Sequence, residues 1–187
     1  SVPWCNPYWD SCTSISATGR SGLAFYFFKL TMLPVALVYW LYWRAAHTTL
    51  RRHGYQGRAI SILGSIAVVA LVMYVLALGA VGDSYQLTRR IGIILFFTFT
   101  YLCQLLILWQ INRLKLPDPS RDLQLALLLL ILAIGLTTVV LDMVLTNYDA
   151  IEDAFEWVIA LLLHSNFLLA AWGWRASRPG SPQQQGV

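Results

Sequence analysis

Residues 123–145 read LQLALLLLILAIGLTTVVLDMVL, a run of 23 residues in which Asp142 is the one charged side chain. At about 1.5 Å per residue, this run forms a helix of roughly 35 Å, long enough to cross the ~30 Å hydrocarbon core of a bilayer. A soluble domain would have to bury such a helix on every side. The stretch therefore predicts a transmembrane helix.

The composition of the whole chain agrees with a membrane protein. Hydrophobic residues make up 58% of its 187 residues and charged residues only 12%, against about 45–50% and about 25% in a typical soluble domain. Four further apolar runs are close to the first in length. We predict an all-α, polytopic transmembrane bundle with five spans, at residues 22–43, 59–81, 91–111, 123–145 and 156–174.

The distribution of Lys and Arg predicts the orientation of these spans. By the positive-inside rule, the side that carries more basic residues faces the cytoplasm, which here places the N-terminus outside and the C-terminus inside. Arg20, Arg89 and Arg90 lie on the outer side, and the last two are a local exception. The inner side carries nine basic residues, namely Arg44, Arg51, Arg52, Arg58, Arg113, Lys115, Arg121, Arg175 and Arg178.

These basic residues also bear on the partners of the chain. The net charge of +4 sits in short clusters at the ends of apolar runs rather than along one polar face, so we predict no nucleic-acid partner. The inner clusters are explained by topology and by contact with anionic lipid headgroups.

The orientation divides the chain into three parts. Residues 1–21 are predicted to form a turn-rich exoplasmic cap, residues 22–174 the transmembrane bundle, and residues 175–187 a disordered cytoplasmic tail. An N-terminus outside must be carried across the membrane, so we expect a processed signal peptide or another helix before Ser1. The expected location is a plasma or inner membrane in a bacterium, or an endomembrane in a eukaryote.

Two of the three cysteines lie in the predicted cap. Cys5 and Cys12 are on the oxidising side and close in sequence, so we predict a disulfide between them, with two free thiols as the alternative. Cys103 lies in the middle of the third span, where a thiol acts as a small apolar residue.

Ionisable side chains inside spans are costly, and they are the first candidates for a site. Lys29 in the first span and Asp142 in the fourth lie at similar depths from the outer ends. An ion pair would keep both charged, and snorkelling of each to water is the alternative. Glu156 and His164, two turns apart, share a broad face of the fifth span.

A metal, a cofactor and a recognised catalytic motif are not predicted. A lone His164 in a span is more often a hydrogen-bonded structural residue than a ligand, and His47 and His53 lie on the other side of the membrane. No spacing of His, Cys and carboxylates matches a zinc or iron site. The sequence has no GxSxG, HExxH, P-loop or dinucleotide motif, so an enzyme is not favoured.

Two stretches resemble a known family. CTSISATGRSG at residues 12–22 is similar to the extracellular P-x-I-S-D-x-G stretch of the damage-regulated autophagy modulator, post-GPI-attachment lipid-remodelling and FGF-receptor-activating proteins. AFEWVIALLL at residues 154–163 resembles the final helix of that family, which typically begins with a Glu and an aromatic residue.

The resemblance implies six spans, one of them upstream of Ser1. By this resemblance, Ser16, Gly19 and Glu156 are expected to form a cluster on the outer face. The family's Asp after Ile-Ser is replaced here by Ala17, so that carboxylate has no counterpart.

Proteins of the family are implicated in lipid remodelling, lipid distribution and membrane trafficking. We therefore predict a non-catalytic protein that binds or handles lipid, or regulates a membrane process, with membrane lipids as its partner. The alternatives are an accessory subunit of a larger membrane complex and a membrane enzyme acting on lipid. The predicted site lies in the outer half of the bundle and comprises Lys29, Asp142, Glu156, His164, Ser16 and Gly19.

Overall fold

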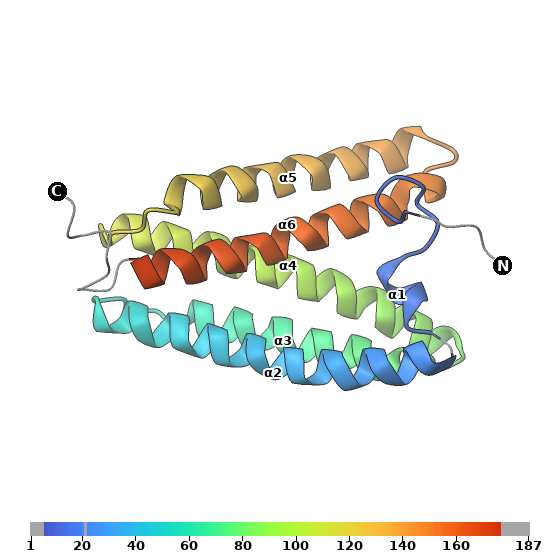
Figure 1. Cartoon of the computed structure of the whole chain (residues 1–187), viewed down its shortest axis with the longest axis horizontal. Helices are drawn as coiled ribbons and strands as arrows, with labels where there is room; N and C mark the ends of the chain where they lie inside the picture. Colours follow the sequence, from blue (N-terminus) through green and yellow to red (C-terminus); the bar gives the residue numbers. More distant parts are fainter. Residues whose placement is uncertain (1–5, 21, 177–187) are drawn as a thin grey trace. The chain divides into compact units, whose positions relative to one another are not determined.

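All regular structure in the described part of the chain is helical. The computed structural model describes residues 6–20 and 22–176. Figure 1 shows a short helix followed by five long ones. The helices are α1 Ile15–Thr18, α2 Gly22–Arg52, α3 Ala59–Ala77, α4 Asp83–Arg113, α5 Arg121–Val144 and α6 Asp149–Ala176.

The predicted fold class is confirmed. Each of α2 to α5, and α6 from Ile151 onward, is long and apolar enough to cross a membrane. This is the architecture of a multi-pass integral membrane protein. The predicted orientation of its ends stays a prediction, and residues 177–187 of the predicted tail lie outside the described residues.

The first long helix continues well beyond its predicted apolar span. Its 31 residues make a rod of about 46 Å, so the part after Trp43 projects past a ~30 Å hydrocarbon core. It ends where Gly54 takes a φ of +99°. The Gly54 and Tyr55 N–H groups then donate to Arg51 O and Leu50 O, the two bonds of a Schellman cap.

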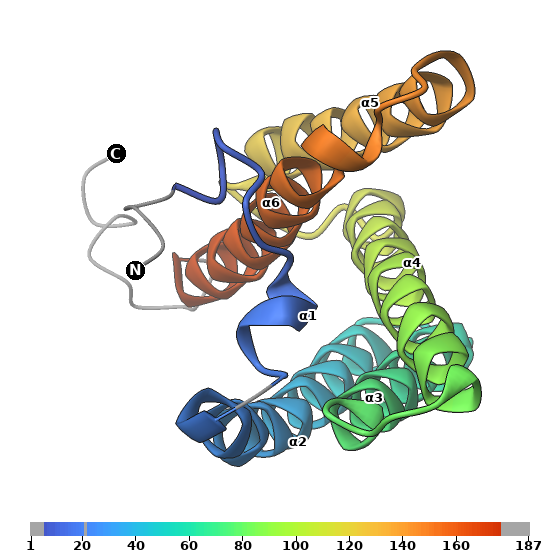
Figure 2. The same ribbon diagram turned by 90° about the vertical axis from the view of Figure 1, so that its right-hand side faces the viewer.

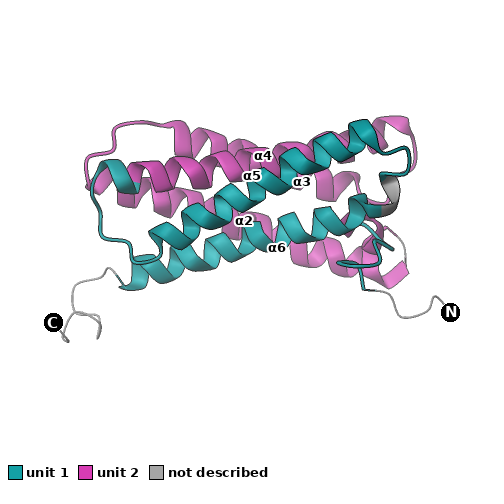
Figure 3. Cartoon of the chain, turned by 90° about the horizontal axis from the view of Figure 1, so that it is seen from above, with its two compact units in different colours: residues 1–14, 111–187 teal, residues 15–110 magenta. Residues whose placement is uncertain are grey.

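The chain forms two compact units, coloured separately in Figure 3. Unit 1 comprises residues 1–14 and 111–187, and unit 2 comprises residues 15–110. The boundary falls near the carboxyl end of α4. The predicted division into cap, bundle and tail stays a prediction.

In unit 2, α2 lies along α3 (Figure 2). Trp43 is 1% exposed and sits against Gly64, where a Cβ atom would lie 2.5 Å from Trp43 Cγ. Gly92 of α4 approaches the α3 backbone in the same way, because its Cβ would lie 3.0 Å from Ala70 O. Small residues at such points let helices pack closely inside a membrane.

In unit 1, α5 lies along α6. Near the start of α5, Ser120 and Gln124 are buried and Asp118 is half-buried. Ser120 Oγ and Gln124 Nε2 donate to the Asp118 carboxylate over 2.6 and 3.0 Å. A Cβ on Gly173 of α6 would overlap the Asp118 carboxylate, so this polar cluster fills the space that the glycine leaves.

Candidate functional site

The predicted outer residue Lys29 has partners within unit 2. Its Nζ donates to Leu76 O over 3.3 Å and lies 4.3 Å from the centre of the Phe25 ring. A positive charge at a helix carboxyl end interacts favourably with the unpaired carbonyl groups there. Asp142 belongs to unit 1, so the predicted Lys29–Asp142 ion pair stays a prediction.

Asp142 is exposed near the carboxyl end of α5, close to the turn into α6. Its charge acts on Tyr148 in that turn. Burial, followed by the negative charges of Glu152 and Asp142, raises the pKa of Tyr148, while a hydrogen bond with Thr138 acts in the opposite direction. The turn is therefore an acidic corner of unit 1.

Glu156 and His164 both lie on α6 of unit 1, and their predicted common face stays a prediction. Glu156 is half-buried, whereas His164 is exposed. Nδ1 of His164 lies 2.6 Å from Ala160 O, one turn earlier in the same helix. This bond to its own backbone is the kind of contact that a structural histidine makes.

Ser16 and Gly19 lie in and just after α1, in unit 2. Ser16 Oγ accepts a hydrogen bond from Arg20 Nη2 over 2.7 Å. Gly19 is buried, and a Cβ there would lie 2.7 Å from Phe28 Cγ, so its role in the fold is close packing. Because Glu156 belongs to unit 1, the predicted cluster of these three residues stays a prediction.

The segment before α1 is attached to the start of α6 within unit 1. Trp157 Nε1 donates to Thr13 O over 2.9 Å, and the Ala154 N–H donates to Ser11 Oγ over 3.2 Å. Cys12, between these two anchors, is disulfide-bonded. Cys5 lies outside the described residues, so the Cys5–Cys12 pairing stays a prediction.

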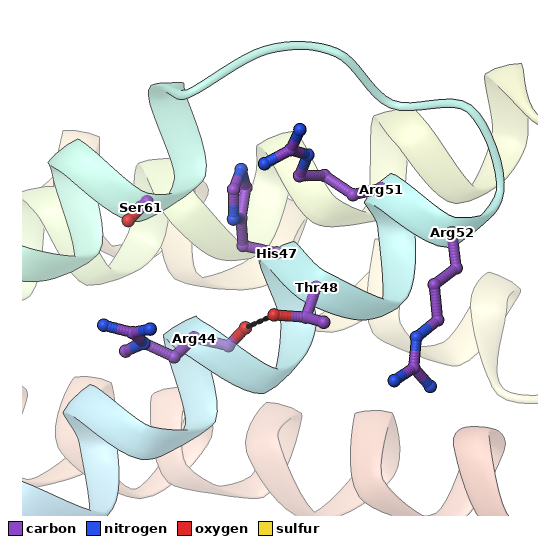
Figure 4. Close-up of a pocket in the computed structure, with 6 residues that line it drawn as sticks. All are labelled: Arg44, His47, Thr48, Arg51, Arg52 and Ser61. Carbon is purple, nitrogen blue, oxygen red and sulfur yellow. Dashed lines mark hydrogen bonds between the residues drawn. The ribbon is translucent and has the colours of Figure 1, made fainter.

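A different site is formed at the other end of unit 2, where α2 turns into α3. A hollow with a cavity volume of about 510 Å³ opens there, and Figure 4 shows the side chains around it. None of its lining residues is acidic. They are Arg44, His47, Thr48, Arg51, Arg52 and Ser61, and we call them the basic hollow.

The spacing of these residues explains how one helix builds most of the hollow. Arg44, His47, Thr48 and Arg51 follow an i, i+3, i+4, i+7 pattern, which places them on one face of α2. Another face of the same stretch carries Trp43, Ala46 and Leu50, which are buried. The same stretch therefore packs with one face and presents basic side chains with the other.

Four contacts hold the hollow in shape. His47 Nε2 lies 3.1 Å from Gly57 O and its ring meets Tyr55 edge-on, so the loop after α2 is tied back to the helix. Thr48 Oγ1 donates to Arg44 O over 2.8 Å (Figure 4). The Arg44 guanidinium lies 5.0 Å from the centre of the Trp40 ring, a cation–π distance.

The first turn of α3 also lines the hollow. Ser61 is in the first turn of that helix, which has no side-chain cap. The positive end of the α3 dipole therefore adds to the field of the arginines. In Figure 4 the His47 and Arg51 side chains extend to the same side of α2, whereas Arg52 extends to the opposite side.

From the sequence, these basic residues are explained by topology and by contact with anionic lipid headgroups, and the hollow itself is not predicted. The signal was present in the i, i+3, i+4, i+7 spacing of polar residues directly after a Trp-rich helix end. It was missed because the predicted span ended at Trp43. The polar cluster of Asp118, Ser120 and Gln124 was also not predicted, because it depends on the close approach of Gly173 from α6.

Comparisons with protein-family models, with curated proteins and with solved structures find no match to this chain. The resemblance to the autophagy-modulator and lipid-remodelling family therefore stays a prediction.

Proposed function

We propose that this chain is a non-catalytic, lipid-binding multi-pass membrane protein, and that the basic hollow is where it binds anionic headgroups. The observation that carries the proposal is a hollow that three arginines line, without an acidic residue, at one end of a membrane-spanning helix pair. Clusters of basic residues next to a transmembrane helix attract anionic lipids, by about 1 kcal/mol for each Lys or Arg.

The position of the hollow along α2 supports a lipid ligand. Tyr39, Trp40, Tyr42 and Trp43 come directly before it, and Trp and Tyr side chains prefer the headgroup level of a bilayer. Residues 44–52 extend about 13 Å further along the helix axis. The arginines would then lie among the headgroups rather than in the hydrocarbon or in bulk water.

The outer-half residues have less support as a site. Lys29, Ser16 and His164 each make a short-range contact with a nearby group in their own unit, as described above. These contacts give the three side chains a role in the fold of their own units. We therefore favour the basic hollow over the outer-half cluster that the sequence predicted.

Native mass spectrometry of the purified protein tests the proposal. The triple variant Arg44→Gln/Arg51→Gln/Arg52→Gln should lose most of the bound anionic lipid that the unaltered protein carries. A matched variant, Arg113→Gln/Arg121→Gln/Arg175→Gln, removes the same amount of charge from the same predicted side of the membrane. This variant should keep the bound anionic lipid. Equal lipid occupancy in the two variants would contradict the proposal.

The same preparation addresses the alternative of an accessory subunit. Blue-native electrophoresis after gentle extraction should show a small species of this chain with lipid. A stable large assembly that contains this chain in fixed proportion to other proteins would favour the subunit interpretation instead.

A further inference from the structure

We infer that the basic hollow is specific for a phosphate monoester on a lipid, such as the headgroup of a phosphatidic acid or a phosphorylated inositol lipid. This inference deepens the proposed function and rests on it. It concerns the chemistry of the headgroup and not only its negative charge.

The donors of the hollow point to an acceptor with several oxygens. Arg44 and Arg51 each offer a planar fork of N–H groups, which matches a carboxylate or a phosphate in a bidentate manner, and Arg52 adds its charge from the opposite side of α2. Ser61 adds a hydroxyl donor. A phosphate monoester has three terminal oxygens, whereas the diester of phosphatidylglycerol has two, so the monoester fits more of these donors at once.

The positive charge of the hollow also favours a phosphate monoester over a diester. A phosphate monoester carries about −1.5 to −2 at pH 7, while a diester carries −1. The positive charges of Arg44 and Arg51, with Arg52 on the other side of α2 and no acidic residue among the lining residues, favour the more highly charged group. Headgroups with an ammonium group are disfavoured, since the hollow offers no carboxylate to pair with it.

The fixed parts of the hollow favour a defined site over a diffuse basic patch. Arg44 is positioned by the Trp40 ring and His47 by Gly57 O. The uncapped first turn of α3 adds backbone N–H groups beside Ser61. The planar guanidinium fork of an arginine discriminates between oxyanions by their shape, which the ammonium group of a lysine does not do.

The test measures the affinity of the full chain in neutral detergent for four soluble probes. These are dioctanoyl phosphatidic acid, dioctanoyl phosphatidylglycerol, dioctanoyl phosphatidylserine and inorganic phosphate. We expect phosphatidic acid to bind about tenfold more tightly than either diester lipid, a difference of about 1.4 kcal/mol. Inorganic phosphate should bind more weakly than phosphatidic acid, because it lacks the acyl chains that a membrane-level site also contacts.

The variants separate this inference from the proposed function. The preference for phosphatidic acid should disappear in Arg44→Gln/Arg51→Gln/Arg52→Gln and persist in Arg113→Gln/Arg121→Gln/Arg175→Gln. Equal affinity for all three lipids, lost in the first variant alone, would overturn the monoester inference and leave the proposed function intact. If inorganic phosphate binds as tightly as phosphatidic acid, the inference that the phosphate monoester belongs to a lipid is overturned. Binding that neither variant changes would overturn both proposals.

Discussion

Single glycines decide how closely helices can approach in each unit. Gly64 faces the Trp43 side chain, and Gly173 faces the Asp118 carboxylate and the Ser120 hydroxyl. Gly135 differs, because a Cβ there would meet nothing within 4 Å. The three positions therefore predict opposite effects for the same substitution.

Gly64→Ala should destabilise the protein by about 1–3 kcal/mol, since the added methyl group would press on the base of a buried indole that cannot move away. Thermal unfolding in detergent measures the effect as a lower midpoint. Gly135→Ala is the matched control and should leave the midpoint unchanged or raise it, because Ala favours a helix more than Gly does. Equal midpoints for the two variants would show that the Trp43 contact does not limit packing.

The Asp118 carboxylate is a second residue with a large expected effect. It accepts hydrogen bonds from Ser120 Oγ and Gln124 Nε2, and both donors are buried. Asp118→Ala removes these bonds from a buried cluster, in which Ser120 Oγ keeps Leu169 O and Gln124 Nε2 keeps Ser120 Oγ as acceptors, so we expect a cost of about 1–3 kcal/mol in all. The midpoint of unfolding should fall clearly.

Asp122 provides the control for this prediction. Its side chain is 87% exposed and pairs with Arg121 at the surface, and surface ion pairs contribute little. Asp122→Ala should therefore have almost no effect on the midpoint. A similar loss in both variants would point to overall charge rather than to the buried cluster.

At the scale of elements, the carboxyl end of α3 is held by two cations. Arg89 Nη1 donates to Ala77 O and Ala80 O over 3.2 and 2.9 Å, and Lys29 Nζ donates to Leu76 O. The last carbonyl groups of a helix lack partners within the helix. This contact gives Arg89, an exception to the positive-inside rule, a structural reason for its place.

Arg89→Ala should destabilise unit 2 by about 1–3 kcal/mol, because two backbone carbonyl groups lose a charged donor. Arg90 is its immediate neighbour and is exposed. Arg90→Ala removes the same charge at the same depth and should leave the unfolding midpoint nearly unchanged. The reverse order of the two effects would contradict the capping role of Arg89.

For the whole molecule, the orientation in the membrane is the property that most affects the proposed function. The basic hollow meets anionic lipid of the cytoplasmic leaflet only if the α2–α3 turn faces the cytoplasm. Gln56 lies in that turn and Ser84 lies at the start of α4, and both are exposed.

A cysteine at each position reports the orientation with a membrane-impermeant maleimide. Gln56→Cys should react only after the membrane is permeabilised, and Ser84→Cys should react in intact cells. Cys103 is buried and gives little background. Labelling in the opposite order would place the hollow on the outer side of the membrane. The hollow would then not meet the anionic lipids of the cytoplasmic leaflet.

The sequence alone determined the class of the protein and the number of membrane-spanning helices in it. Hydrophobicity over about twenty consecutive residues is a local property, so each run predicts its own helix whatever its neighbours are. The start of α5 followed from the same local reasoning. The end of α2 did not, because a polar continuation of a helix has no apolar run to mark it.

Only the tertiary structure decided which polar residues meet. The basic hollow joins residues of α2 to Ser61, across a turn whose path depends on Gly54 and on the bond between His47 and Gly57. Asp118 and Gly173 are 55 positions apart and come together because α5 packs along α6. Such contacts depend on the approach of helices to one another, which is a property of packing and is not encoded in any single stretch of the chain.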